Sequence, residues 1–175
     1  SKRYAIESVN FLPSNSTPFP TVFVFFQWDV KYFGSLLRFS ANSSESVRMA
    51  EPSSTRNSLA EEFGVGLFED NNECINGAEL ILICVKPQIV KNVCLALKSS
   101  REQLVISIAA GITTKALSDW LPRKQSIIRC MPNTPALIGQ GASGLFANKF
   151  TSEQQKELAQ YIMDSVGLTV WLKRE

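Results

Sequence analysis

The segment Ala78–Val85, with the sequence AELILICV, constrains the fold of this 175-residue chain more than any other feature. From Leu80 onward it is continuously apolar, so it lacks the polar alternation of a strand that keeps one face in water. A run of this kind is typical of a strand buried on both faces of a parallel sheet. Helices must then cover both sides of that sheet, which predicts an α/β fold.

Short apolar runs alternate with helical patterns from Val47 to the end of the chain. Further strands are predicted at Val47–Ala50, Val65–Phe68, Leu104–Ile108, Ser126–Arg129 and Leu168–Leu172. Helices are predicted at Ser53–Gly64, Gln88–Lys98, Thr114–Leu121 and Thr151–Gly167, with a helical turn from Asn72. This alternation indicates βα units around a Rossmann-like parallel sheet flanked by helices.

Residues 1–46 have a different composition. Proline, serine and asparagine are frequent on both sides of one β-like run, Thr21–Phe26, and no helix with clear caps is visible. We therefore divide the chain into a divergent segment, 1–46, of no assigned role, and a Rossmann-like domain, 47–175. The domain is expected to be incomplete at its N-terminal βα unit.

The composition argues against several classes of function. The formal net charge is only +2, and no cluster of lysine and arginine runs along the sequence, so a nucleic-acid partner is not expected. The run Thr21–Phe26 is far shorter than the ~20 residues that span a bilayer, and no signal-peptide pattern precedes it. We expect a cytoplasmic protein without a membrane partner.

Cysteine and histidine usage narrows the chemistry. The four cysteines form no C-x-x-C pair and the chain has no histidine, so a metal site is not expected and Ser-His-Asp or Cys-His catalysis is excluded within this chain. The cysteines are interpreted as buried, reduced thiols.

Three segments that follow predicted strands carry unusual residues, and ligands of open parallel sheets bind at the carboxyl ends of the strands. Lys86, in the sequence VKP, either reaches a phosphate or carboxylate or is a solvated strand-end lysine. The small residues of Ser107–Thr113 either let a dinucleotide approach the backbone or form an ordinary tight turn. Asn133, between two prolines, either binds a carboxamide or carboxylate or bonds its own backbone.

Together, these segments resemble the nucleotide-binding domain of pyrroline-5-carboxylate reductases, which reduce 1-pyrroline-5-carboxylate to L-proline with NAD(P)H. The resemblance covers roughly Ala50–Lys173 and rests on CVKPQIV, VISIAAGIT and above all IIRCMPNTPALIGQGASGLFA. The segment VGLTVWL matches the end of this domain in bacterial members. The resemblance implies an oxidoreductase of proline biosynthesis with a small-molecule substrate.

The resemblance also implies a set of cofactor contacts. The turn after the strand Val47–Ala50 handles the adenosine ribose in this family, so Ser53 and Arg56 are expected at a 2′-phosphate. Glu51 would instead favour a free ribose hydroxyl, so NADP is expected and NAD is the alternative. Asn133 is expected near the nicotinamide. The other implied contacts are Asn71, Cys84, Val85, Lys86, Pro87, Ile108, Ala109 and Ala110.

Two parts of the family pattern are missing from the sequence. The G-x-G-N-M loop that holds the pyrophosphate is absent, and the glycines Gly64 and Gly66 follow a predicted helix instead of opening one. The helical C-terminal domain, which supplies substrate and dimer contacts in the family, would come after Glu175. We therefore expect no assignable catalytic residue in this chain, no family oligomer contacts, and little or no reductase activity.

Two classes of function remain open at this stage. The first is a pyrroline-5-carboxylate reductase polypeptide in an incomplete or divergent form. The second is a non-catalytic, decayed Rossmann domain that acts as a binding or interaction module. Among enzymes, a related β-hydroxyacid or imine dehydrogenase is the alternative, but it offers no reason for the sequence MPNTPAL.

Overall fold

The computed structural model describes residues 22–26, 47–50, 66–138 and 140–175. The strands of the described residues are β1 (Val22–Phe26), β2 (Val47–Ala50), β3 (Gly66–Phe68), β4 (Leu80–Cys84), β5 (Leu104–Ser107), β6 (Ser126–Pro132), β7 (Gly141–Ala147) and β8 (Gly167–Trp171). The helices are α3 (Asn71–Cys74), α4 (Pro87–Ala96), α5 (Thr114–Trp120) and α6 (Glu153–Asp164), with the 3-10 helix η2 (Thr134–Ile138). None of these helices is long and apolar enough to cross a membrane.

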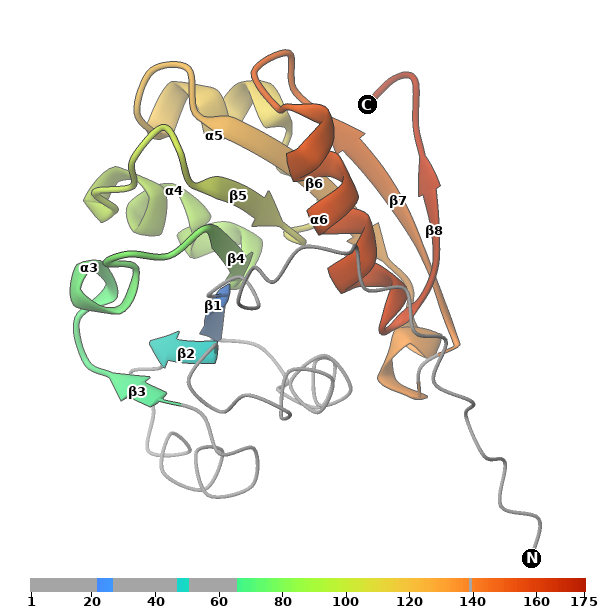
Figure 1. The fold of residues 1–175 in the computed structure, drawn as a ribbon, viewed down its shortest axis with the longest axis horizontal. Coiled ribbons are helices and arrows are strands. Elements are labelled where there is room, and N and C mark those ends of the chain that lie inside the picture. Colours follow the sequence, from blue (N-terminus) through green and yellow to red (C-terminus); the bar gives the residue numbers. More distant parts are fainter. Residues whose placement is uncertain (1–21, 27–46, 51–65, 139) are drawn as a thin grey trace, which may run out of the picture.

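All of these strands belong to one sheet with the order β3-β2-β1-β4-β5-β6-β7-β8 (Figure 1). Neighbouring strands are parallel except for β6 and β7, which are antiparallel. The order from β3 to β6 is that of a dinucleotide-binding Rossmann fold. The predicted α/β, Rossmann-like class is confirmed, with a sheet that is mostly parallel.

The strand β1 comes from the segment 1–46, to which the sequence analysis gave no role. It lies between β2 and β4, where Val22 pairs with Val47 on one side and with Leu80 on the other. The β-branched and aromatic residues of this run favour a strand. The first βα unit therefore contributes its strand to the sheet, whereas residues 27–46 and the predicted helix 53–64 lie outside the described residues.

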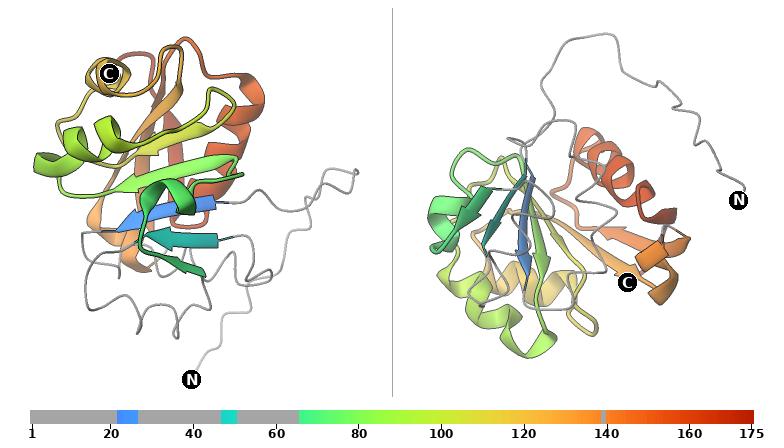
Figure 2. Two further views of the ribbon diagram at one scale, coloured as in Figure 1. Left: turned by 90° about the vertical axis from the view of Figure 1, so that its left-hand side faces the viewer. Right: turned by 90° about the horizontal axis from the view of Figure 1, so that it is seen from below.

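Burial on both faces of β4 organises the core. Leu80 and Leu82 belong to a cluster that α6 covers, and Ile81 and Ile83 belong to a second cluster under α3, α4 and α5. All four of these side chains are fully buried. Figure 2 shows α4 and α6 on opposite sides of the sheet. The apolar run therefore forms the doubly covered strand that its sequence predicts.

The hairpin of β6 and β7 was not predicted, because the sequence between Arg129 and Thr151 suggested only a loop. In the structure β6 continues to Pro132, and β7 returns beside it with Leu145 opposite Cys130. Because β7 is rich in glycine and alanine, its sequence shows no clear alternation of apolar and polar residues. One of its glycines is required by packing, since a Cβ on Gly141 would lie 2.7 Å from the Cβ of Ala136.

The helix α6 begins at Glu153, two residues after the predicted start at Thr151. Ser152, and not Thr151, is the N-cap, and it forms a capping box with Gln155. The Thr151 hydroxyl is used elsewhere, because it donates to the Ile127 carbonyl at 3.2 Å. The spacing of residues along the chain does not show that a hydroxyl will bond to a distant strand instead of capping the helix.

A buried amide network joins the loops that lead into the amino ends of β5 and β6. The Gln125 side chain is 1% exposed, accepts a hydrogen bond from the Ser99 hydroxyl at 2.8 Å, and donates to the carbonyls of Ser100 and Gln103. The Gln103 amide in turn donates to the Ile75 and Ala78 carbonyls. These bonds satisfy polar backbone groups that burial would otherwise leave without partners.

We predict that Gln125→Met lowers the free energy of unfolding by about 2–4 kcal/mol, because the isosteric apolar chain leaves buried carbonyls and a hydroxyl without partners. Urea denaturation followed by circular dichroism measures this change. Gln88→Met, on the exposed surface of α4, is the matched control and should stay within about 0.5 kcal/mol of the parent chain. Equal losses in the two variants would contradict the assigned role of Gln125.

Candidate functional site

The parallel strands β1 to β6 place their carboxyl ends at one edge of the sheet. The strand order reverses at β1, so the crevice between β1 and β4 is the topological switch point where ligands of such sheets bind. Phe26 and Cys84, the last residues of these strands, are paired in register. The segment that follows Cys84 therefore flanks the candidate cofactor crevice.

The turn Cys84–Pro87 leads from β4 directly into α4. Val85 is buried, and Lys86 is the exposed N-cap residue, with no hydrogen bond from its side chain to the helix. Pro87 occupies the first helical turn, where its missing N–H costs nothing. The N-terminus of α4, which carries the positive end of the helix dipole, and the exposed Lys86 therefore lie at the same edge, which suits an anionic ligand.

The turn Ile108–Ala110 follows β5, the next strand in the sheet. The Ile108 N–H donates to the Ile83 carbonyl at 3.2 Å, which ties the turn to β4. The buried Ser107 hydroxyl accepts a hydrogen bond from the Ala109 N–H at 3.3 Å, and this bond stabilises the turn. Ser107 was not among the predicted site residues, although a hydroxyl at the end of an apolar strand could have indicated a polar role in the turn.

Asn133 follows β6 and is exposed. Its Oδ1 accepts from the Ala142 N–H at 2.9 Å, and its backbone carbonyl accepts from the Ala136 N–H at 3.1 Å. The side-chain bond thus crosses to β7 instead of closing a turn on the residue's own backbone. With Oδ1 engaged, the side-chain amide nitrogen is the group of Asn133 that can donate to a ligand.

Of the remaining predicted contacts, the structure describes Asn71, which lies on the other side of β1. Asn71 is the first residue of α3, which follows the outermost parallel strand, β3. Ser53 and Arg56 lie outside the described residues. The structure thus brings Cys84–Pro87, Ile108–Ala110 and Asn133 to three consecutive strand ends, and Asn71 to the far end of the same edge.

A charged cluster that the sequence analysis missed lies beside the start of α5. The Glu175 carboxylate accepts from the Thr114 N–H at 2.6 Å and from its hydroxyl at 3.1 Å, and it lies 3.4 Å from Arg129 Nη1. Arg129 Nε is buried and has no hydrogen-bond partner among the described residues. The cluster ties residues after β8 to β6 and α5, a contact between distant segments that no local pattern predicts.

The four cysteines are buried, unpaired thiols, as the sequence predicted. Burial raises the pKa of Cys74, Cys94 and Cys130 to about 12 and that of Cys84 well above its usual value. At neutral pH these thiols are protonated and poor nucleophiles. In the part of the chain that the structure describes, no group of three potential metal ligands comes together.

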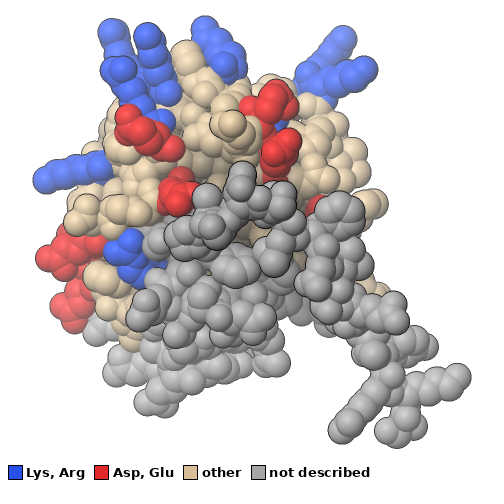
Figure 3. All heavy atoms as spheres, viewed as in Figure 1, with Lys and Arg blue, Asp and Glu red and all other residues tan. Residues whose placement is uncertain are grey.

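The surface in Figure 3 carries lysine and arginine side chains with aspartate and glutamate among them. The described part of this face therefore carries charges of both signs.

The raised thiol pKa values make stability depend on pH. An unfolded cysteine ionises near pH 9, whereas folded Cys130 ionises only near 12, so the native state binds more protons in this window and loses stability as the pH rises through it. We predict that Cys130→Ala flattens the decline in the free energy of unfolding between pH 9 and 11 by up to about 1.4 kcal/mol per pH unit.

Urea denaturation in the presence of a reductant, repeated across this pH range, measures the slope. Val90→Ala also truncates a buried side chain but removes no titratable group, so its slope should equal that of the parent chain. Parallel curves for Cys130→Ala and the parent would argue against the buried thiol as the cause.

Comparison with known proteins gives one consistent result at the level of sequence. Residues 33–111 match the family model for NADP oxidoreductase, coenzyme F420-dependent. The pyrroline-5-carboxylate reductase of Pseudomonas aeruginosa is 42% identical over 142 residues, which are 79% of this chain and 52% of that protein. The enzyme of Pisum sativum is 32% identical over 130 residues, or 73% of this chain and 47% of that protein. The chain thus spans about half the length of these relatives.

Solved structures agree with this result. The pyrroline-5-carboxylate reductase of Coxiella burnetii matches with a TM-score of 0.81 and 30% identity, over 89% of this chain and 60% of that one. The Plasmodium falciparum enzyme, solved with NADP bound, matches with a TM-score of 0.73 and 24% identity, over 89% of this chain and 58% of that one. The second match shows a shared fold.

Proposed function

The chain is homologous to pyrroline-5-carboxylate reductases over about half of their length, and we propose that it carries the NAD(P)H-binding domain of such an enzyme. The reaction of the family is the reduction of 1-pyrroline-5-carboxylate to L-proline. Within this proposal the ligands are small molecules and the protein acts in the cytoplasm, without nucleic-acid or membrane partners.

The observation that carries the proposal is the placement of three turns at one edge of the sheet. The turns Cys84–Pro87 and Ile108–Ala110 and the residue Asn133 follow the neighbouring strands β4, β5 and β6. This edge borders the switch point between β1 and β4, the usual dinucleotide position in the fold. A single strand-end lysine or small-residue turn would not support a cofactor site, but their alignment on consecutive strands does.

Each turn has a role that its chemistry supports. Lys86 and the N-terminus of α4 bind phosphate, because both are electropositive and exposed at the edge. The small residues Ala109 and Ala110 let the cofactor approach the backbone, and the Asn133 amide nitrogen donates to the nicotinamide carboxamide. When bound, NAD(P)H supplies the hydride, and the chain supplies its position. Asn71, Ser53 and Arg56 complete the set, with Arg56 favouring the 2′-phosphate of NADP.

The segment after β1 sets a limit on this function. Gln27 to Gly34 contains a single glycine and a carboxylate, Asp29, where the family places its glycine loop. Backbone N–H groups of such a loop are difficult to replace as phosphate donors. We therefore propose weakened cofactor binding and little reductase activity for this chain alone. A decayed Rossmann domain that serves only as an interaction module is the alternative, and it predicts no specific cofactor binding.

We predict that NADPH binds in a saturable manner in isothermal titration calorimetry. Lys86→Met should weaken binding about tenfold, because it removes a charge-assisted phosphate contact. Lys91→Met, an exposed lysine on the same helix, should leave the Kd within about twofold. Arg56→Gln should weaken NADPH more than NADH. Failure of both cofactors to bind the correctly folded chain would favour the interaction module.

We also predict that turnover of 1-pyrroline-5-carboxylate, followed by NADPH absorbance, is at least about 10²-fold below that of a full-length relative under the same conditions. The reason is that the sequence lacks the glycine loop of the family, so the cofactor is not held in place against the substrate. Turnover within a few-fold of the relative would show that the glycine loop is dispensable.

A further inference from the structure

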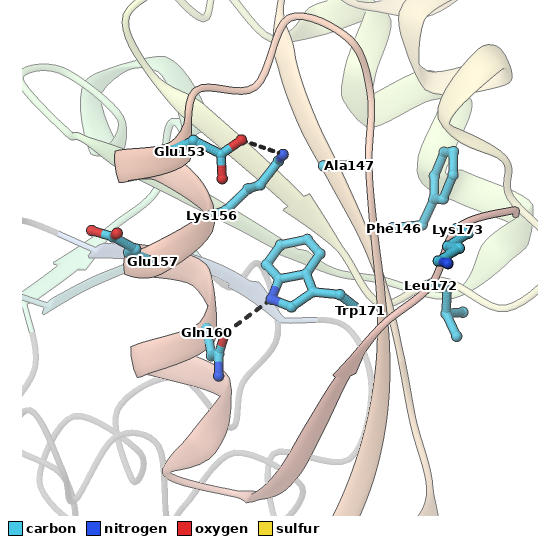
Figure 4. A pocket seen from close by; sticks show the side chains of 9 residues that line it. All are labelled: Phe146, Ala147, Glu153, Lys156, Glu157, Gln160, Trp171, Leu172 and Lys173. Atoms are coloured by element: carbon cyan, nitrogen blue, oxygen red, sulfur yellow. Dashed lines mark hydrogen bonds and ion pairs between the residues drawn. The ribbon is translucent and has the colours of Figure 1, made fainter.

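A cavity of about 410 Å³ lies between α6 and the strands β7 and β8 (Figure 4). It is remote from the candidate cofactor crevice, because β5 and β6 separate β7 from β4. Its strand residues Phe146 and Ala147 pair with Arg129 and Ile128, so they lie several residues before the Asn133 end of β6. The cofactor proposal therefore leaves this cavity without a role.

The floor of the cavity is an indole ring that is already held in place. Trp171 is half-buried against the core cluster under α6, and its Nε1 donates to Gln160 Oε1 at 2.9 Å. Figure 4 shows the ring between α6 and the strands, with Gln160 bonded to one end of it. A ring fixed in this way offers an apolar surface for a ligand at little cost in conformational entropy.

The rim of the cavity carries charges of both signs. Lys156 Nζ lies 2.7 Å from Glu153 Oε1, one helical turn away, and the two side chains are 32% and 82% exposed. Glu157 and Lys173 add one further charge of each sign. The rim is therefore neutral as a whole, but it can contact an anionic and a cationic group at the same time.

We propose that this cavity binds a small zwitterion with an apolar body, which is the chemical class of free amino acids. The ligand carboxylate pairs with Lys156, its ammonium group pairs with Glu153, and its side chain lies on the Trp171 ring. The charges that now satisfy each other in the Lys156–Glu153 pair then each gain a ligand partner. The volume is within the usual range of small-molecule sites. This proposal does not depend on cofactor binding.

Nuclear magnetic resonance of the indole N–H groups tests the proposal directly. The chain has three tryptophans, and loss of one resonance in Trp171→Phe identifies the signal of this residue. Titration with L-phenylalanine should shift the Trp171 signal in a saturable manner. The analogue 3-phenylpropanoate lacks the ammonium group and 2-phenylethylamine lacks the carboxylate, so each should bind at least about tenfold more weakly.

A matched pair of lysine variants tests the assigned contact. Lys156→Met should weaken L-phenylalanine binding about tenfold, whereas Lys115→Met should leave it unchanged. Lys115 is also ion-paired on a helix, with Asp119 at 3.0 Å, but it lies outside the cavity. Well-dispersed indole signals in both variants would establish that they are folded. No saturable shift, equal binding of either analogue, or equal affinity of the two variants would each overturn the proposal.

Discussion

The burial of β4 on both faces is the constraint on which the rest of the structure depends. Each of its apolar side chains stabilises the fold by about 1.5–3 kcal/mol only if helices cover both sides of the sheet. The side chains of Leu80 and Leu82 enter one core cluster, and those of Ile81 and Ile83 enter the other. The layers of helices on the two faces therefore follow from one strand, and so does the central place of that strand in the sheet.

The parallel arrangement that buries β4 also produces the candidate site. Parallel strands present their carboxyl ends at one edge, so turns that are far apart in the sequence become neighbours there. The Ile108 N–H bonded to the Ile83 carbonyl is one such link, between the turn after β5 and the neighbouring strand β4. The amino ends of β5 and β6 lie at the opposite edge. There the buried Gln125 amide links the loops that lead into both strands and gives backbone carbonyls their hydrogen bonds. One edge of the sheet thus holds the candidate cofactor site, and the other holds a buried hydrogen-bond network.

The sequence alone accounted for much of the fold. Strands β2, β4 and β5 and helices α4 and α5 lie within a residue or two of their predicted bounds, because burial and helix caps leave strong local patterns. The hairpin of β6 and β7 was missed because the small residues of β7 give no clear strand pattern in the sequence. They form a strand by pairing with β6 in the folded chain. The Arg129–Glu175 contact was missed for a related reason, since it exists only after distant segments meet. Ser107 differs, because its hydrogen bond comes from the Ala109 N–H only two residues away.

The sequence by itself determined the α/β class, the succession of most elements and the relationship to pyrroline-5-carboxylate reductases, since each of these is recorded in short stretches of adjacent residues. Only the tertiary structure decided that Val22–Phe26 is a central strand, that the Asn133 side chain is bonded to β7, and that a cavity with a tryptophan floor lies beside α6. These features arise from contacts between residues far apart in the chain, and no local pattern of hydrophobicity or propensity specifies which partners meet.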